Sequence, residues 1–428
     1  ASYLDDQDIF IEELNFSNPN LYKTEEGWKK LKIDKQYIKI KNSSDIEIER
    51  RWTSNGPVLP ETAFDLLSIT PKNHVATLSW TALTEKDTTI SSAINLMLSQ
   101  NVQKGLVALE DFFAPSLNFL LVDSEKMALK TVGKMPRRSP LNQTQGRMPS
   151  LGWKSENKWR GYWGYEVNPV IKSSPGDILG NTNNKISDAK FPKHVSHFWG
   201  DTQRILRWQK LMQNREVHTR ESFIEAQLDT VSPTARALLP LIGSELWYSQ
   251  PMGEAGSKER LRFDAISMLA SWNGEMSEHL PEPLIYSTWM KFLQKSLIDD
   301  DLGPISARFS HFNPIFVEKV FRNIDGASNW CDIKHSSYKE TCVEIASKSL
   351  DEALSWLREK YGKNLNSLRW GEAHEAFHRH ETLGTFPILK YLVNIRQSTS
   401  GGDNTLMRGK TVGKGKEPFI NIHAAVYR

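Results

Sequence analysis

The amino-acid sequence predicts an α+β protein: a sheet-based body that carries a large helical insertion. Three observations predict it. Strand patterns dominate the first third of the chain, the apolar period changes to 3.6 residues from Thr202 onward, and strand-like runs return near the end. We therefore expect a β-rich part with long loops over residues 1–200, a helical region over 201–365, and a return to the sheet over 366–428.

The strand signals in the first third come largely in pairs. Residues 37–41 and 46–49 alternate apolar and polar side chains on either side of an Asn-Ser-Ser turn, which predicts a hairpin. Residues 118–122 and 128–132 flank a polar segment in the same way. Residues 76–80 form a further candidate strand. These runs predict that sheet structure dominates this part of the chain.

The middle and the end of the chain follow other patterns. From about residue 140 to residue 200 the sequence is rich in Gly, Pro, Asn and Trp and has little periodicity. Long ordered loops of this kind are more often functional than mere linkers. Helices are then predicted around residues 205–212, 223–228, 261–271, 284–297 and 338–361, the last ending at Gly362. We expect residues 387–393 and 418–426 to return to the sheet.

Composition excludes some classes of function. The 428 residues include 54 Lys and Arg against 51 Asp and Glu, a balance that argues against a dedicated nucleic-acid surface. No run of eighteen apolar residues is present, so we expect no membrane span. The only cysteines are Cys331 and Cys342, without a CxxC zinc motif; a local disulfide and two independent thiols both remain open. Because the chain starts without Met or a signal-like segment, we expect it to be a fragment.

Three stretches carry a resemblance to a known family. Residues 5–14 follow a "D-x-x-D-hydrophobic-F/Y-x-E" pattern, residues 159–184 a "W-x-G…N-P…G-x-I…N-x-N-N" pattern, and residues 199–205 a "W…R-hydrophobic" pattern. Weaker matches occur in the same order at residues 55–59, 78–81, 136–138, 271–274 and 370–374. In these segments the chain resembles the β-subunit of penicillin acylase (penicillin amidase), an N-terminal-nucleophile hydrolase, along essentially its whole length. The cysteine pair is more similar to the N-acyl-homoserine lactone acylase branch.

The resemblance implies a fold and an activity. The fold is an αββα sandwich, here incomplete, and the activity is hydrolysis of an acyl amide such as a β-lactam antibiotic or an N-acyl-homoserine lactone. The nucleophile is a serine freed by self-cleavage of a precursor, with its own α-amino group as the base. We expect that serine upstream of Ala1, so this fragment alone should be inactive without the α-chain and the remaining β-chain segments. Members are usually exported, which implies a periplasmic or secreted bacterial protein. The competing reading is an inactive homologue that serves as a binding module.

The resemblance also implies site residues. Asn183 matches the asparagine whose side-chain amide donates to the oxyanion of the tetrahedral intermediate, with Asn181 as the second candidate. Ala1 matches the residue whose backbone N–H is the other oxyanion donor. Arg204 matches an arginine near the site, where a cation can hold the catalytic asparagine. We expect Asn183 to point into a cleft shared with Ala1 and Arg204.

Two metal sites can be considered. Asp5 and Asp8 match carboxylates that hold a structural calcium ion in some family members, although the family's further Asp between positions 192 and 199 has no counterpart here. No cofactor is otherwise required. Residues 374–378 match the HExxH zinc motif, which on a helix would place His374 and His378 on one face. The alternative is a pair of histidines that only pack and form hydrogen bonds.

Overall fold

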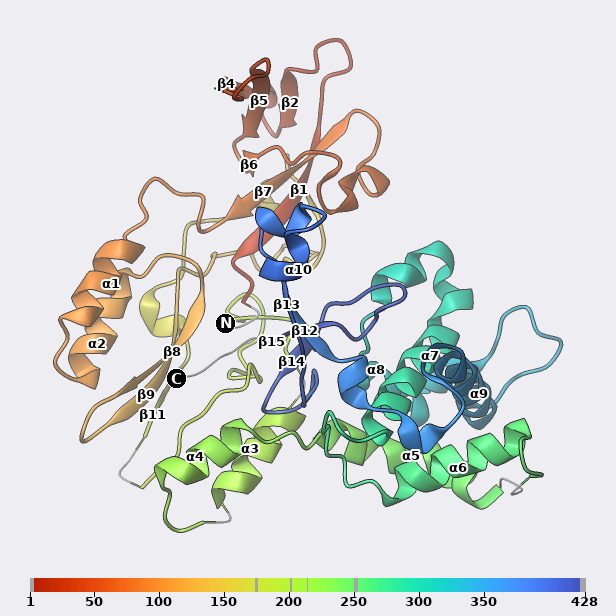
Figure 1. The fold of residues 1–428 in the computed structure, drawn as a ribbon. Coiled ribbons are helices and arrows are strands. Elements are labelled where there is room, and N and C mark those ends of the chain that lie inside the picture. The colour runs from red at the N-terminus through yellow and green to blue at the C-terminus, as the bar shows by residue number, and fades with distance from the viewer. Residues whose placement is uncertain (1–3, 174–175, 201, 214, 250–252, 424–428) are drawn as a thin grey trace. The chain divides into compact units, whose positions relative to one another are not determined.

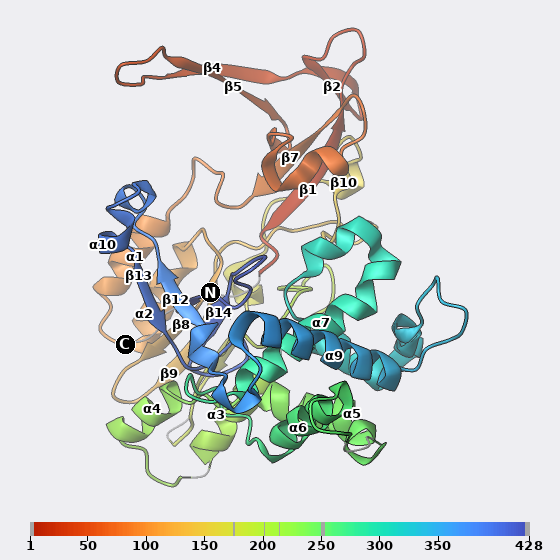
Figure 2. The ribbon, with the colours of Figure 1, turned by 45° about the vertical axis from the view of Figure 1, so that its right-hand side comes forward.

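A computed structural model of the chain describes residues 4–173, 176–200, 202–213, 215–249 and 253–423. The chain divides into two compact units, residues 1–200 and 201–428, and each unit is described by itself. Strands and helices both occur throughout (Figures 1 and 2). The mixed α+β class predicted from the sequence is confirmed at this level.

Strand β1 (Gln7–Glu13) organises the first unit. It pairs antiparallel with β7 (His74–Trp80) along its whole length and parallel with the short β10 (Ser150–Leu151). Side chains two apart in a strand lie on the same face, and on β1 this face carries Asp8, Phe10 and Glu12, all of them buried. Two carboxylates are therefore enclosed on one side of the strand, and each needs polar partners.

Small antiparallel sheets make up most of the rest of this unit. They are β2–β3 (Leu21–Thr24, Gly27–Lys30), β4–β5–β6 (Lys32–Ile38, Ile46–Thr53, Gly56–Pro57) and β8–β9–β11 (Leu117–Val122, Met127–Val132, Val170–Lys172). Both predicted hairpins and the predicted strand at 76–80 are confirmed. Figure 2 shows β4 and β5 as a long two-stranded ribbon.

The first unit also contains two helices that the sequence patterns did not indicate. They are α1 (Thr89–Met97) and α2 (Val102–Ala108), joined by a short turn. From α2, Val102 and Leu106 pack against Ala128 of β9. Each helix is short, and its burial is confined to one side, so its apolar stripe is too brief to stand out in the sequence.

Residues 133–200 contain little regular structure, as predicted from about residue 140 onward. The loops are nevertheless fixed by polar side chains that are themselves buried: Arg138, Asn142, Asn157, Asn168 and His194. Asn168, for example, donates a hydrogen bond from Nδ2 to the backbone oxygen of Gly133 at 2.9 Å. These loops form an ordered part of the structure because buried polar groups hold them to the sheets.

The second unit is mainly helical. Its helices are α3 (Gln203–Gln213), α4 (Arg220–Gln227), α5 (Pro233–Ser249), α6 (Lys258–Ser271), α7 (Glu282–Leu302), α8 (Pro314–Phe321), α9 (Cys342–Tyr361) and α10 (Lys390–Val393). Helix α7 is the centre of the core, with Trp289, Met290 and Leu293 fully buried. Helix α9 packs along it, and Trp289 Nε1 donates to the backbone oxygen of Ala346 at 3.0 Å. The predicted helices are confirmed, whereas α5 and α8, each beginning at a proline, were missed.

Helix α9 shows how local sequence sets the ends of a helix. Thr341 and Glu344 form a capping box at its start, and Gly362, with φ 106°, ends it as predicted. The start therefore lies at Cys342 rather than at residue 338. A disulfide joins Cys342 to Cys331, with 5.0 Å between their Cα atoms, and confirms one of the two readings of the cysteine pair.

The C-terminal part forms a four-stranded sheet in the order β13 (Ile395–Ser398), β12 (Glu375–His378), β15 (Asn421–His423), β14 (Gly409–Thr411). Residues 421–423 thus return to a sheet, as predicted for 418–426, whose last residues lie outside the described part. The prediction of a strand at 387–393 is wrong. Residues 390–393 form the short helix α10, with Tyr391 and Leu392 largely exposed. A short apolar run does not distinguish strand from helix by its period.

Candidate functional site

The asparagine-rich loop is closed by its own side chains. Oδ1 of Asn181 accepts a hydrogen bond from the backbone N–H of Asn183 at 3.0 Å, and Oδ1 of Asn184 accepts one from that of Thr182 at 3.1 Å. Asn183 itself has a left-handed backbone with φ 69°, a conformation that asparagine tolerates well. Asn181 and Asn184 therefore shape the turn, and Asn183 is the residue that this turn holds in place.

Of the other two predicted catalytic residues, Arg204 alone lies within the described part of the chain. Ala1 lies outside the described residues. Arg204 belongs to the second unit, at the start of α3, where its Nε donates to the backbone oxygen of Thr405 at 3.1 Å. The structure therefore fixes the surroundings of Asn183 and of Arg204 separately, and the cleft that they would share with Ala1 stays a prediction.

Asp8 is bound by an arginine. Arg138 donates from Nε to Oδ2 of Asp8 at 2.8 Å and from Nη2 to Oδ1 at 3.1 Å, and both side chains are buried. The Trp159 indole N–H also donates to Oδ2. Nη2 of Arg138 further donates to the backbone oxygen of Asp5 at 3.0 Å. The Asp8 carboxylate thus already has a cationic partner, while calcium binding by Asp5 and Asp8 stays a prediction.

Asp5 lies against two histidines from the end of the loop region. Its Oδ2 accepts a hydrogen bond from the backbone N–H of His197 at 2.9 Å and lies 3.2 Å from Nε2 of His194. Burial raises the pKa of Asp5, but contacts with His194 and His197 and the charge of Arg138 lower it more, so the pKa lies below its usual range. The two imidazole rings stack with 4.0 Å between centroids.

Sequence reasoning missed this cluster. One potential ligand atom from each of Asp5, His194 and His197 lies within 4.8 Å of the others. Between Pro192 and Trp199, a carboxylate is the ligand that the family resemblance leads one to seek, and none is present there. The signal that could have found the cluster is the His-x-x-His spacing in that interval, since imidazole is itself a common metal ligand.

A second buried carboxylate on the same face of β1, that of Glu12, accepts hydrogen bonds from neutral side chains in the described part of the chain. Oε1 of Glu12 accepts hydrogen bonds from Asn55 Nδ2 and Thr53 Oγ1, each at 2.8 Å, and from Thr77 Oγ1 at 3.2 Å. Gly152 lies so close that a Cβ added there would meet Oε2 of Glu12 at 2.2 Å. These contacts link β1 to three other segments of the first unit, so we assign Glu12 a role in holding the fold together.

The zinc-peptidase alternative for residues 374–378 is wrong. Residues 375–378 form the strand β12 rather than a helix, so positions 374 and 378 are separated by about 13 Å at the usual rise of a strand. His374 is fully buried, its Nδ1 2.8 Å from the backbone oxygen of Thr399 and its Nε2 3.2 Å from that of Gly409, and it stacks on Trp370. His378 is exposed. The alternative, packing and hydrogen bonding, is confirmed for His374.

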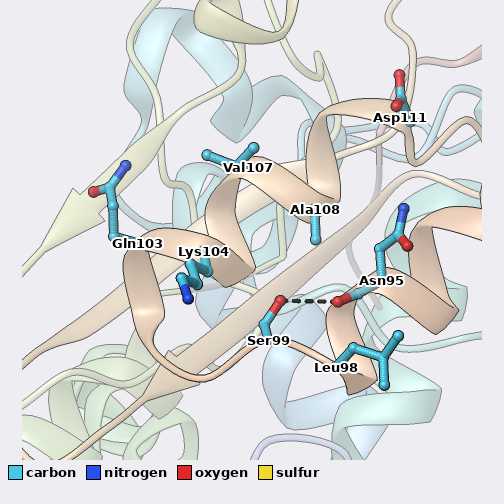
Figure 3. Close-up of a pocket in the computed structure, with 8 residues that line it drawn as sticks. All are labelled: Asn95, Leu98, Ser99, Gln103, Lys104, Val107, Ala108 and Asp111. Atoms are coloured by element: carbon cyan, nitrogen blue, oxygen red, sulfur yellow. Dashed lines mark hydrogen bonds between the residues drawn. The ribbon is translucent and has the colours of Figure 1, made fainter.

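Two surface hollows lie in the described part of the first unit. The larger, about 460 Å³, lies between α1 and α2 (Figure 3) and is lined by Asn95, Leu98, Ser99, Gln103, Lys104, Val107, Ala108 and Asp111. None of the predicted site residues lines it. A smaller one of about 150 Å³ lies beside Gln7, Asp8 and Ile9 of β1 and residues 146–149. None of the helices in the described part is long and apolar enough to cross a lipid bilayer.

Comparisons with known proteins agree on one family. The family model described as penicillin amidase matches residues 1–428. An acyl-homoserine lactone acylase QuiP of Pseudomonas putida is 23% identical over 392 residues, which are 88% of this chain and 46% of that protein. The QuiP of Pseudomonas aeruginosa is 21% identical over 440 residues, 96% of this chain and 52% of that protein. The chain thus spans about half the length of these relatives.

Two further relatives extend the comparison. Penicillin acylase 2 proenzyme of a Pseudomonas species is 24% identical over 276 residues, 64% of this chain and 34% of that protein. Among solved structures, a thermostable penicillin G acylase from Alcaligenes faecalis superposes with a TM-score of 0.67 at 19% identity, covering 86% of this chain and 68% of that one. At this identity the superposition shows a shared fold.

Proposed function

Because the chain belongs to the penicillin amidase family, we propose that the protein it comes from is an amide hydrolase that releases an acyl group from an amine. The observation that carries the proposal is the match of the family model along residues 1–428. The relatives named as acylases support the same reaction. This chain spans about half the length of the two acyl-homoserine lactone acylases, so the activity is proposed for the whole protein.

The substrate we propose first is an N-acyl-homoserine lactone, with an acylated β-lactam as the second. Two of the relatives are named acyl-homoserine lactone acylases, and each aligns with most of this chain. The relative named as a penicillin acylase aligns with a smaller share. In both substrates the scissile bond is a secondary amide between an acyl chain and a ring-bearing amine, so one hydrolytic mechanism serves either.

We propose that Asn183 stabilises the negative charge that develops on the amide oxygen. Attack by the N-terminal serine implied by the family converts the carbonyl into an oxyanion, and a fixed side-chain N–H lowers the energy of that state. The left-handed turn closed by Asn181 supports this role, because the Asn181 side chain accepts from the Asn183 backbone N–H and so fixes the Asn183 backbone. The Ala1 backbone N–H is the proposed second donor, and Arg204 the proposed positioning cation.

The remaining expectations are proposed for the complete protein. These are an αββα sandwich completed by the α-chain and the other β-chain segments, and a periplasmic or secreted location. The disulfide between Cys331 and Cys342 supports export, since such bonds persist in oxidising compartments.

The experiment is an assay for the amine product. The complete protein is incubated with N-acyl-homoserine lactones of several chain lengths and with penicillin G, and the free primary amine is labelled and separated chromatographically. Release of homoserine lactone or of the β-lactam nucleus is expected, and it should be abolished when the N-terminal serine is replaced by alanine. Binding of these ligands without any amine release would overturn the hydrolase in favour of the binding module.

A further inference from the structure

We propose that Asp5, His194 and His197 form a binding site for a divalent transition-metal ion, with zinc as the representative ion. The site is built from two segments of the first unit that are far apart in sequence and is independent of the proposed hydrolysis. Its potential ligand atoms, one from each residue, already lie within 4.8 Å of one another. Donor atoms of a tetrahedral zinc site lie about 3.3 Å apart, given bonds of ~2.0–2.1 Å. Binding therefore requires the three side chains to move closer together and the two stacked imidazole rings to tilt until their lone pairs converge on one ion.

The strongest observation is the state of His194. Its side chain is 3% exposed, and neither ring nitrogen forms a well-aligned hydrogen bond with any described residue. Nε2 lies 3.2 Å from Oδ2 of Asp5, close to the carboxylate but without the alignment of a hydrogen bond. A buried imidazole whose polar contact in the described part is this poorly aligned one is costly. An ion held between Nε2 and the carboxylate would satisfy both groups.

His197 is oriented as a metal-ligating histidine is. Its Nε2 lies 3.2 Å from the backbone oxygen of Gln145. Donation from Nε2 to that carbonyl fixes the proton on Nε2 and leaves the lone pair on Nδ1. Ligating histidines in proteins usually donate their second ring N–H to a carbonyl or carboxylate in this way. The Gln145 carbonyl therefore sets the tautomer that a metal requires.

The framework around the three residues is already fixed by the backbone. The backbone N–H of Asp5 donates to the oxygen of Val195 at 3.0 Å, and the backbone N–H of His197 donates to Oδ2 of Asp5 at 2.9 Å. Phe191 packs against both imidazoles. Because these contacts hold the backbone of both segments, binding requires rotation of the imidazole side chains but little reordering of the chain. The Asp5 side chain is 25% exposed, which gives an ion and its remaining water ligands access.

The donor set selects the class of metal. Two imidazoles and one carboxylate suit zinc and its neighbours among the transition metals. Calcium needs six to eight oxygens, and the carboxylate of Asp8 is paired with Arg138. The proposed site therefore differs in chemistry from a calcium site made by Asp5 and Asp8.

The test measures metal binding rather than catalysis, so its outcome does not depend on the hydrolase proposal. The complete protein is stripped with a chelator and titrated with Zn²⁺ against a chromophoric competitor, and bound metal is counted by elemental analysis. We expect one tightly bound Zn²⁺ per chain. His194→Gln and His197→Gln should each weaken binding at least about 100-fold, because loss of an outer-shell partner alone costs 10–100-fold. His279→Gln, a change of an exposed histidine, is the matched control and should bind as wild type does.

Two measurements on the unaltered protein keep the test decisive if a variant fails to fold. Co²⁺ substitution should give the visible bands of a four- or five-coordinate site, and X-ray absorption of the Zn²⁺ form should show two imidazole ligands. Addition of Ca²⁺ should not displace Zn²⁺. Absence of stoichiometric Zn²⁺ binding, displacement by Ca²⁺, or unchanged affinity in folded His194→Gln would each overturn the site and leave the stacked histidines as a packing feature.

Discussion

Arg138 and Asp8 form a buried ion pair, with 2.8 Å between Nε and Oδ2 and side chains that are 1% and 6% exposed. Removing one member of such a pair leaves a charge buried without a partner. Arg138→Met should therefore lower the free energy of unfolding by roughly 3–5 kcal/mol, measured by denaturant unfolding. Arg137→Met, at the exposed neighbouring position, is the control. Asp8→Asn combined with Arg138→Met should recover part of the loss, and equal stabilities of the two single arginine variants would refute the role of the pair.

Asn183 can be tested without disturbing its backbone. In the complete enzyme, Asn183→Ala should lower kcat on the order of 10²–10³-fold, about 3–4 kcal/mol, with little change in KM. Asn183→Gly is the matched variant, since glycine accepts the positive φ of 69° at no cost and also lacks the amide. Both should lose kcat alike. Asn181→Ala removes the acceptor that closes the turn and should act on KM or expression instead. If Asn183→Gly keeps wild-type kcat, the oxyanion donor is another residue.

The disulfide should stabilise the second unit. It joins residues 11 positions apart, and closing a loop of about this length restricts the unfolded chain by about 3 kcal/mol. The difference between the oxidised and the reduced protein in the free energy of unfolding should have this size. In the double variant Cys331→Ala, Cys342→Ala, addition of reductant should change nothing. Two alkylatable thiols in protein taken from an oxidising compartment would contradict the bond.

The burial of Lys130 leads us to expect a specific pH dependence of the free energy of unfolding. Its side chain is buried and donates to the backbone oxygens of Asn168 at 2.7 Å and Tyr165 at 3.0 Å. Burial lowers its pKa in the folded protein below the unfolded value of about 10.4. Between the two values the unfolded chain binds more protons, so stability rises with pH there. The stability of wild type relative to Lys130→Met should therefore increase as pH rises toward that value. A flat difference would mean that burial does not perturb this amine.

The sequence was a good guide wherever one local signal decides the structure. The alternation around the Asn-Ser-Ser turn predicted the β4–β5 hairpin, and Gly362 predicted the end of α9, because turn and cap residues act on their immediate neighbours. Residues 390–393 and the HExxH match failed for the converse reason. In both, a short pattern was compatible with helix and strand, and contacts with distant segments decided between them.

The candidate site also contains both local contacts, which the sequence predicts, and contacts between distant segments, which it does not. The turn that holds Asn183 is made by residues within three positions of it, so the loop could be identified from the sequence alone. The partner of Asp8 is 130 residues away at Arg138, and the histidine beside Asp5 is 192 residues away at His197. No local sequence pattern predicts a contact between residues so far apart, and only the folded structure shows that Arg138 neutralises Asp8.

The same separations have a consequence for the order of folding. Strand β1 contains Asp8, yet Asp8 acquires its ion-pair partner only when Arg138 has been synthesised, and Asp5 meets the backbone of residues 195–197 later still. Contacts of this range make folding slow, because the entropy of closing a long loop is lost before the contacts form. Strand β1 is therefore completed only well after its own synthesis, and until then its unpaired edge is open to pairing with other chains.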